Sequence, residues 1–282
     1  MLKNIENFIG CESDYKSADI ALFGAPFDST TSYRPGARFA MKAMRAESYG
    51  LETYSPYQDA DMSEIKVFDA GNLELPAGDT ENSLEAIEKI CAEIASDGKI
   101  PVMVGGEHLV TLGAVRALKK RYGELYVIHF DAHTDLRDEY MGVKLSHACV
   151  IRRIFETVGE GVIFQFGIRS GEKSEFIFGE KHTNLVKYGF DGLCKTVERL
   201  KGKNVYFTLD LDVLDPSVLP GTGTPEAGGV SFAELLDAVI EVGGLNLVGA
   251  DITELAPALD ASGCSTAVAC KILRELLLTF KK

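Results

Sequence analysis

Short apolar runs recur along the chain and are separated by segments with helical periodicity. The runs are candidate strands because most are apolar on both alternating faces, as central parallel strands are. They cover residues 19–26, 65–71, 100–106, 125–131, 162–170, 204–212 and 245–253.

The segments between these runs predict helices. One ends in basic residues and Gly123, and another opens with Ser231 and Glu234 in the spacing of a capping box. This alternation predicts a doubly wound, mostly parallel sheet within one domain that spans residues 1–282. The clearest helical segments cover residues 81–98, 109–123, 231–244 and 265–280.

Composition narrows the class of protein. The 282 residues carry a formal net charge of −13, whereas a nucleic-acid partner favours a basic surface. No stretch approaches the roughly 20 apolar residues that span a bilayer, and the N-terminal residues contain no signal-like apolar run. The six cysteines form no C-x-x-C motif. We therefore expect a cytoplasmic protein with reduced thiols and with neither a nucleic-acid nor a membrane partner.

The segment "VIHFDAHTD" places polar side chains where an apolar strand ends. Asp131, His133 and Asp135 alternate along it, and alternate side chains of an extended chain point to one face. Burying such carboxylates without partners is costly, which predicts a bound cation. His129 lies one step inward on the same face, where we expect a packed, hydrogen-bonded core histidine rather than a ligand.

Three other strands end in residues of the same kind. His108 follows a Gly-Gly turn, Asp210 and Asp212 repeat the alternate spacing, and Glu254 follows the last strand. Parallel strands bring these ends to one edge of a sheet, and no Lys or Arg is interleaved to neutralise them. Four carboxylates and two imidazoles exceed the coordination of one ion and suit two divalent cations. Oxygen-rich ligands favour Mn²⁺, with Fe²⁺, Co²⁺ and Ni²⁺ left open.

Several neighbouring residues are expected to support this site. Glu107 could either support the metal ligands from behind or be a helix N-terminal acid that pairs with the helix dipole, and we favour the second reading. Thr208 is expected to lie beside the ligands rather than among them. The loop at 220–229 is expected to lie beside the metal edge as a flexible loop that shapes the pocket. Arg34 and Arg38 are expected to form structural ion pairs or contacts between subunits.

Five segments together resemble the ureohydrolases, the family of arginase, agmatinase and their relatives. The segments "RPGAR", "GGEH", "DAHTD", "FTLDLDVLDP" and "GTGTPEAGG" match in order and spacing over nearly the whole chain. The resemblance implies a three-layer α/β/α fold and a homotrimer or homohexamer. It also implies a binuclear Mn²⁺ enzyme that hydrolyses a small cationic guanidino substrate to urea and an amine.

The resemblance also assigns individual ligands to the two Mn²⁺ ions. In this assignment Asp131 and Asp210 bridge the ions. One ion takes His108, Asp131, Asp135 and Asp210, and the other takes His133, Asp131, Asp210 and Asp212.

The same resemblance implies roles for three catalytic residues. A hydroxide shared by the two ions attacks the guanidino carbon, and Asp135 orients it by accepting a hydrogen bond. Glu254 holds the guanidinium through a paired salt bridge. His147, in "KLSHACVIRR", matches the family's proton-shuttling histidine and protonates the leaving amine.

The segment "DLRDEY" favours the agmatinase branch of the family. Arg137 stands where arginases typically have an Asn that helps to hold the amino-acid end of arginine. Agmatine carries a second cation at its far end, and Asp138 or Glu139 could face it. Ala148 and Cys149 follow His147 where many agmatinases have Gly-Thr, so aminopropylagmatine, guanidinobutyrate and arginine stay open as substrates.

Three readings of other classes compete with this one. A metal-dependent deacetylase-like amidohydrolase can share this architecture, but such enzymes typically use a tandem His pair, and the sequence contains no His-His. A non-catalytic relative would be expected to lack His147 or Glu254, and both are present. A scaffold with structural metals would be expected to saturate them with protein ligands.

Overall fold

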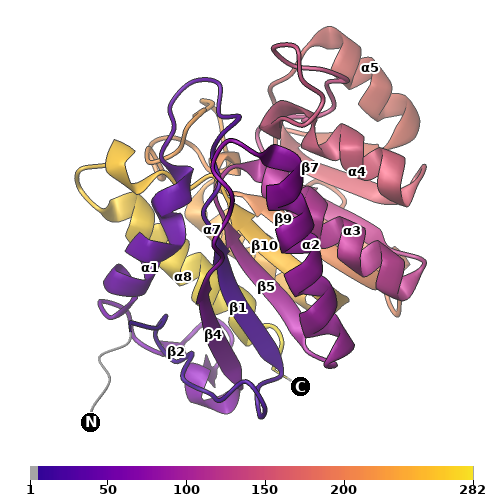
Figure 1. The fold of residues 1–282 in the computed structure, drawn as a ribbon. Coiled ribbons are helices and arrows are strands. Elements are labelled where there is room, and N and C mark those ends of the chain that lie inside the picture. Colours follow the sequence, from indigo (N-terminus) through magenta and orange to yellow (C-terminus); the bar gives the residue numbers. More distant parts are fainter. Residues whose placement is uncertain (1–5, 282) are drawn as a thin grey trace.

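A computed structural model of the protein describes residues 6–281, which build an eight-stranded sheet between two helical layers (Figure 1). The strand order is β4-β1-β5-β10-β9-β6-β7-β8, and every neighbouring pair is parallel. The strands are β1 (Ile20–Ala25), β4 (Val67–Asn72), β5 (Ile100–Gly105), β6 (Tyr126–Phe130), β7 (Ile163–Ile168), β8 (Asn184–Lys187), β9 (Asn204–Asp210) and β10 (Asn246–Thr253).

All seven strands expected from the sequence are present, with ends that differ by up to two residues. The sequence pattern missed β8 because this four-residue strand lies at the edge of the sheet and is only partly buried. It also missed a small antiparallel pair of two-residue strands, β2 (Tyr54–Ser55) and β3 (Ala60–Asp61). Such short strands are too brief to show a period.

The helices divide between the two faces of the sheet, which confirms the three-layer architecture. One face carries α1 (Ala40–Ser48), α6 (Leu193–Leu200), α7 (Phe232–Gly243) and α8 (Cys264–Leu278). The other face carries α2 (Thr80–Ser96), α3 (Thr111–Tyr122), α4 (Val150–Val158) and α5 (Lys173–His182). The two layers are visible on either side of the strands in Figure 1.

The expected helix ends are also found. Ser231 caps α7, because the Glu234 N–H donates to its hydroxyl and the Glu234 carboxylate accepts from the Ser231 N–H. After α3, Gly123 takes a φ of 73°, a conformation that glycine adopts without strain.

Single-turn 3₁₀ helices follow several strands and carry candidate site residues. His108 begins η3, His147 begins η4, and Asp212 lies in η5 directly after β9. A short turn at a strand end fixes side chains more tightly than a long loop. The turns are η1 (Ala37–Phe39), η2 (Met62–Glu64), η3 (His108–Val110), η4 (His147–Cys149), η5 (Leu211–Val213) and η6 (Pro257–Leu259).

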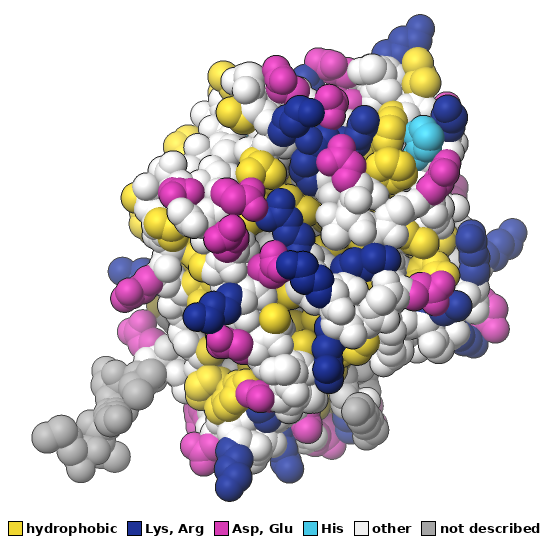
Figure 2. Space-filling view, turned by 45° about the vertical axis from the view of Figure 1, so that its right-hand side comes forward, with side chains coloured by type: hydrophobic (Ala, Val, Ile, Leu, Met, Phe, Trp, Pro, Cys, Tyr) yellow, Lys and Arg dark blue, Asp and Glu magenta, His cyan; other side chains and the backbone are white. Residues whose placement is uncertain are grey.

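The sheet separates two apolar cores. Aromatic side chains such as Phe130, Phe166 and Phe207 are buried on the α6–α8 side, whereas Phe23 and Tyr206 are buried on the α2–α4 side. Figure 2 shows basic and acidic side chains intermingled over the outer face formed by α2–α5. None of the helices in residues 6–281 is long and apolar enough to cross a membrane.

Candidate active site and metal centre

The candidate residues converge at the carboxyl ends of four adjacent central strands. These strands are β5, β10, β9 and β6, in that order across the sheet. A cavity of about 290 Å³ opens at this edge. Its lining includes seven of the eight predicted site residues, and the eighth, Asp131, is fully buried next to them. The seven are His108, His133, Asp135, His147, Asp210, Asp212 and Glu254.

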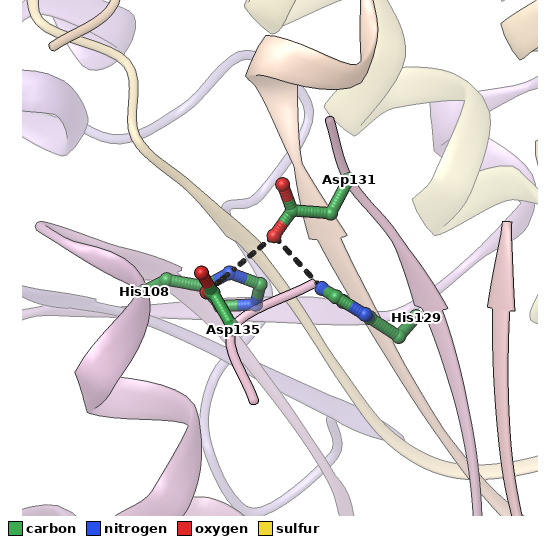
Figure 3. A group of neighbouring side chains, drawn as sticks. All are labelled: His108, His129, Asp131 and Asp135. Carbon is green, nitrogen blue, oxygen red and sulfur yellow. Dashed lines mark hydrogen bonds and ion pairs between the residues drawn. The ribbon is translucent and has the colours of Figure 1, made fainter. Parts of the chain in front are cut away.

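The imidazole of His108 faces three carboxylates. Its Nδ1 atom lies 3.0 Å from Asp131 Oδ2 and 3.2 Å from both Asp135 Oδ2 and Asp210 Oδ2. Figure 3 shows the carboxylates of Asp131 and Asp135 beside the His108 imidazole. Although it is buried, this Nδ1 makes no hydrogen bond of acceptable geometry. A nitrogen lone pair and three oxygens directed at one point are suitable ligands for a single cation.

A second group of the same kind lies beside the first. His133 Nδ1 is 3.0 Å from Asp212 Oδ2 and 3.4 Å from Asp131 Oδ1. Asp131 therefore directs one oxygen to the His108 group and the other to the His133 group. This arrangement can hold two cations with Asp131 between them.

Backbone N–H groups fix the orientation of these carboxylates. Asp131 Oδ1 accepts from the His133 N–H, Asp210 Oδ1 accepts from the Asp212 N–H at 2.9 Å, and Asp212 Oδ1 accepts from Ala132 at 3.1 Å. The Asp210 and Asp212 oxygens directed at the imidazoles are thereby left available. The local turns after β6 and β9 thus organise the ligands before any cation binds.

The charge of the cluster fits divalent cations. Among the described residues, no Lys or Arg pairs with any of the four aspartates. Burial and the neighbouring carboxylates raise the pKa of Asp135 to about 7 and that of Asp210 well above its usual value. Burial alone would lower the pKa of His133, but Asp212 and Asp131 raise it well above its usual value. Cations would replace the protons that this crowding retains.

The hydrogen bonds of His129 exclude it as a ligand, although it lies within reach of the same group. The Gln165 amide nitrogen donates to the Thr134 carbonyl at 2.9 Å and contacts His129 Nδ1 at 3.1 Å. His129 Nδ1 must therefore accept, which puts the proton on Nε2, 2.8 Å from Asp131 Oδ2 (Figure 3). The expectation of a packed, hydrogen-bonded core histidine is confirmed.

Two candidate residues have a left-handed backbone. Asp135 has a φ of 52° and Glu254 a φ of 65°. Non-glycine residues adopt this conformation at a cost, and they retain it where the surrounding structure requires it. The Arg152 N–H holds the Asp135 carbonyl at 3.1 Å, and the Glu254 N–H donates to Gly106 at 3.0 Å. These bonds turn both carboxylates toward the cavity.

Glu254 is a buried carboxylate on the floor of the cavity. Its Oε1 accepts from the His108 N–H at 2.7 Å, and the described residues offer no hydrogen bond to Oε2. Burial and the nearby Glu107 raise its pKa well above the usual value. The free oxygen of this carboxylate is therefore available to a cationic group in the cavity.

His147 lies at the cavity wall and is held by residues that the sequence did not indicate. Its Nε2 is 3.2 Å from Ser32 Oγ, and its backbone N–H donates to Thr30 Oγ1 at 3.1 Å. Thr30 in turn donates to Glu107. Glu107 stands at the N-cap of η3, as expected, but its carboxylate makes no cap hydrogen bond and accepts from the Thr30 N–H instead.

The loop at 220–229 lies beside the cavity, as expected. Hydrogen bonds from two arginines hold its backbone, although the sequence had led us to expect a flexible loop. Arg34 donates to the carbonyls of Thr222 and Gly223 at 2.6 and 3.2 Å. Arg169 donates to the Glu226 carbonyl at 2.8 Å and to the Asp212 carbonyl at 2.7 Å. Arg38 pairs with Asp28. The expected structural ion pair is therefore confirmed for Arg38, whereas Arg34 binds backbone carbonyls of the loop and no carboxylate of the described residues.

The two acidic residues considered for the far end of a substrate do not face the cavity. Asp138 is exposed and pairs with Arg153 at 2.8 Å, and the exposed Glu139 does not line the cavity. That expectation was wrong because the chain turns outward after Arg137.

A different acidic pair lines the cavity. Glu172 and Glu175, at the start of α5, line it together with Arg137 and Tyr140. Arg137 Nη1 is 2.6 Å from Glu172 Oε1, and its guanidinium stacks on the Tyr140 ring at 4.7 Å. No sequence pattern indicated this acidic pair, because α5 follows a different strand from the metal segments.

Comparisons with known proteins agree with this geometry. The model of the arginase family matches residues 18–279. The chain is 44% identical to the agmatinase of Bacillus subtilis over 98% of this chain and 96% of that protein. It is 41% identical to the N(1)-aminopropylagmatine ureohydrolase of Thermococcus kodakarensis over 86% and 84% of the two chains. The agmatine ureohydrolase structure of Thermoplasma volcanium superposes with a TM-score of 0.89 at 34% identity, covering 99% and 95%.

The central strands of the parallel sheet end in histidines and aspartates, and the family model and the relatives match nearly the whole chain. Together these two findings define the class of this protein. The chain belongs to the arginase family. It is a ureohydrolase, an enzyme that acts on guanidino groups.

Replacing Asp131 tests the arrangement of the two groups. We expect Asp131→Ala to lose both cations, because each group loses the oxygen that Asp131 supplies. Metal content after dialysis against Mn²⁺, measured by plasma mass spectrometry, checks this. Asp138→Ala removes an exposed carboxylate and serves as the control that keeps both ions. Two ions retained in Asp131→Ala would refute the bridging position.

Proposed function

We propose that this protein hydrolyses agmatine to urea and putrescine, with two Mn²⁺ ions per subunit and residues 1–282 acting as one ureohydrolase domain. The proposal rests above all on the paired groups around His108 and His133, with one Asp131 oxygen directed to each. Relatives named agmatinase, 43–44% identical over 98% of the chain, support the choice of substrate.

The proposed ligands follow from the two groups. Asp131 would be shared between the ions, because its two oxygens face the two groups. Resemblance to the ureohydrolases would add Asp210 as a second shared ligand, and His108, Asp135, His133 and Asp212 would each serve one ion. Divalent ions held there would lower the pKa of a water molecule and so supply a nucleophile at neutral pH. Asp135 would orient that nucleophile, since its carboxylate lies at the His108 group and lines the cavity.

Glu254 would hold the guanidinium of the substrate. Its Oε2 is free of protein hydrogen bonds in the described residues, and the left-handed backbone directs the carboxylate into the cavity. A planar guanidinium can donate two parallel N–H groups to a carboxylate, which fixes its orientation as well as its position. The guanidino carbon would then face the metal groups, which share the floor of the cavity with Glu254.

His147 would move the proton to the leaving amine. Burial lowers the pKa of its imidazole to about 4, so the ring is neutral at pH 7. A neutral ring can accept a proton at Nε2 and then donate it, which makes His147 a relay rather than a resident acid. Ser32, 3.2 Å from Nε2, orients the ring.

The acidic pair Glu172 and Glu175 in the cavity lining favours a substrate with a distal cation. Two glutamates, Glu172 and Glu175, face a single Arg137 there, which leaves one negative charge in excess. The ammonium of agmatine would meet this excess, whereas the carboxylate of arginine would be repelled by it. Arg137 could instead attract a guanidino acid, so guanidinobutyrate stays the main alternative, with aminopropylagmatine as a second.

Other expectations carry over as parts of this proposal. Membership of the arginase family favours a ureohydrolase over the deacetylase-like alternative. A homotrimer or homohexamer and a cytoplasmic location stay predictions, which light scattering and cell fractionation can test.

A panel of guanidino compounds tests the proposed substrate. We expect the Mn²⁺-loaded protein to release urea from agmatine much faster than from arginine, guanidinobutyrate or N1-aminopropylagmatine. A colorimetric urea assay measures each rate, with Asp131→Ala protein as background. Arginine as the best substrate would overturn the choice of branch, and no urea from any compound would overturn the function itself.

Replacing His147 tests the proposed relay. We expect His147→Ala to keep both ions but to lower kcat for agmatine about 10²-fold, the usual contribution of a positioned proton donor. Steady-state kinetics and metal analysis of the same preparation check the two expectations separately. An unchanged kcat would remove His147 from the reaction.

Replacing Glu172 tests recognition of the distal cation. An exposed charge pair contributes about 1 kcal/mol, so we expect Glu172→Gln to raise the KM for agmatine about fivefold. The KM for butylguanidine, which has no distal charge, should stay unchanged. Asp138→Asn is the matched control outside the cavity. An equal rise for both compounds would show that Glu172 acts on the fold rather than on the substrate's far end.

A further inference from the structure

A buried carboxylate that is not among the proposed ligands is linked to His108 through one hydroxyl group. Asp251 in β10 is fully buried and pairs with no Lys or Arg in the described part of the chain. A buried carboxylate is costly unless hydrogen bonds compensate it. Its partners are two hydroxyls of the adjacent strand β9, where Asp251 lies opposite Thr208.

In the hydrogen bonds from His108 through Thr208 to Asp251, each donor can be identified. Tyr206 donates to Asp251 Oδ2 at 2.5 Å, and Thr208 Oγ1 donates to Oδ1 at 2.6 Å. A hydroxyl carries one proton, so Thr208 has only lone pairs left for its other neighbours. His108 Nε2 lies 2.9 Å from the same oxygen and must therefore be the donor. Thr111, at 3.3 Å, can only donate to it as well.

This direction decides which nitrogen of His108 is free. With the proton on Nε2, the Nδ1 atom carries a lone pair, and Nδ1 is the buried nitrogen that faces three aspartates without a hydrogen bond. A carboxylate behind an imidazole also makes the opposite nitrogen a stronger donor to a metal.

We infer that Asp251, acting through Thr208, fixes the proton of His108 on Nε2 and thereby holds Nδ1 ready to bind a divalent cation. Asp251 and Thr208 are positioning residues, since neither reaches the cavity. The inference rests on the proposed function only in requiring that a cation binds beside His108.

In residues 6–281, no comparable chain of hydrogen bonds to a buried carboxylate lies behind His133, the histidine of the second group. His133 is partly exposed, and its Nε2 lies 3.8 Å from Glu226 Oε1, beyond hydrogen-bonding distance. Loss of the Thr208 hydroxyl should therefore weaken one of the two cation sites and spare the other. A general loss of stability would weaken both.

Mn²⁺ binding to Thr208→Val tests this asymmetry. The protein is stripped with chelator and titrated with Mn²⁺, and the free ion is measured by its electron paramagnetic resonance signal. We expect one dissociation constant to rise about 10- to 100-fold and the other to change less than about threefold. Thr208→Ser restores the hydroxyl and should restore the affinity. Thr266→Val removes a buried hydroxyl in α8 and should change neither constant. Two unchanged constants, or two equally raised ones, in Thr208→Val would overturn the inference.

The position of the proton can be read without metal or substrate. The chain has five histidines, so two-bond ¹H–¹⁵N spectra of histidine-labelled, metal-free protein contain few imidazoles, and Thr208→Val identifies the signal of His108. Burial alone would lower the pKa of His108, but Asp131, Asp135 and Asp210 raise it well above its usual value, so the spectra are recorded at a pH above that pKa. There we expect the Nε2–H form of His108 in the wild type and in Asp251→Asn, whose carbonyl can still accept from Thr208. We expect a mixture of forms in Thr208→Val, with circular dichroism confirming the fold. An Nδ1–H form in the wild type would overturn the inference even if urea is released, and absence of urea would leave this measurement valid.

Discussion

The repulsion among buried carboxylates at one edge of the sheet is the constraint on which the site depends. Asp131, Asp135, Asp210 and Asp212 come from two strands and their following turns and lie around two imidazoles. Neither a Lys nor an Arg among the described residues shares this position. Such a cluster is stable with doubly charged cations and strained without them. The fold supplies the remaining stability through two apolar cores on either side of the strands.

In the hydrogen bonds around this cluster, the donor and the acceptor can be assigned to specific atoms. Backbone N–H groups hold one oxygen of Asp210 and one of Asp212 and leave the other for a cation. Gln165 fixes the proton of His129 on the nitrogen that faces Asp131, and Thr208 accepts the proton of His108. The hydrogen-bond network thus specifies both which atoms can bind metal and which cannot, before a cation arrives.

The chemistry divides between the floor of the cavity and its walls. The floor carries the metal groups and Glu254, which come from the four central strands. The walls carry His147, Glu172 and Arg137, which come from turns and helix ends. Substrate choice can therefore vary through the walls while the floor stays unchanged, a division common to enzymes built on parallel sheets.

The sequence by itself determined the strands, the alternate spacing of Asp131, His133 and Asp135, and that of Asp210 and Asp212. Local backbone geometry fixes these features, and period-two alternation puts side chains on one face without long-range information. Only the tertiary structure decided what lies between segments far apart in the chain. In the folded chain Glu107 binds Thr30, and Glu172 rather than Asp138 lines the cavity. Asp251 is linked to His108 through the Thr208 hydroxyl. Side-chain contacts across strands and loops depend on packing, which no local pattern records.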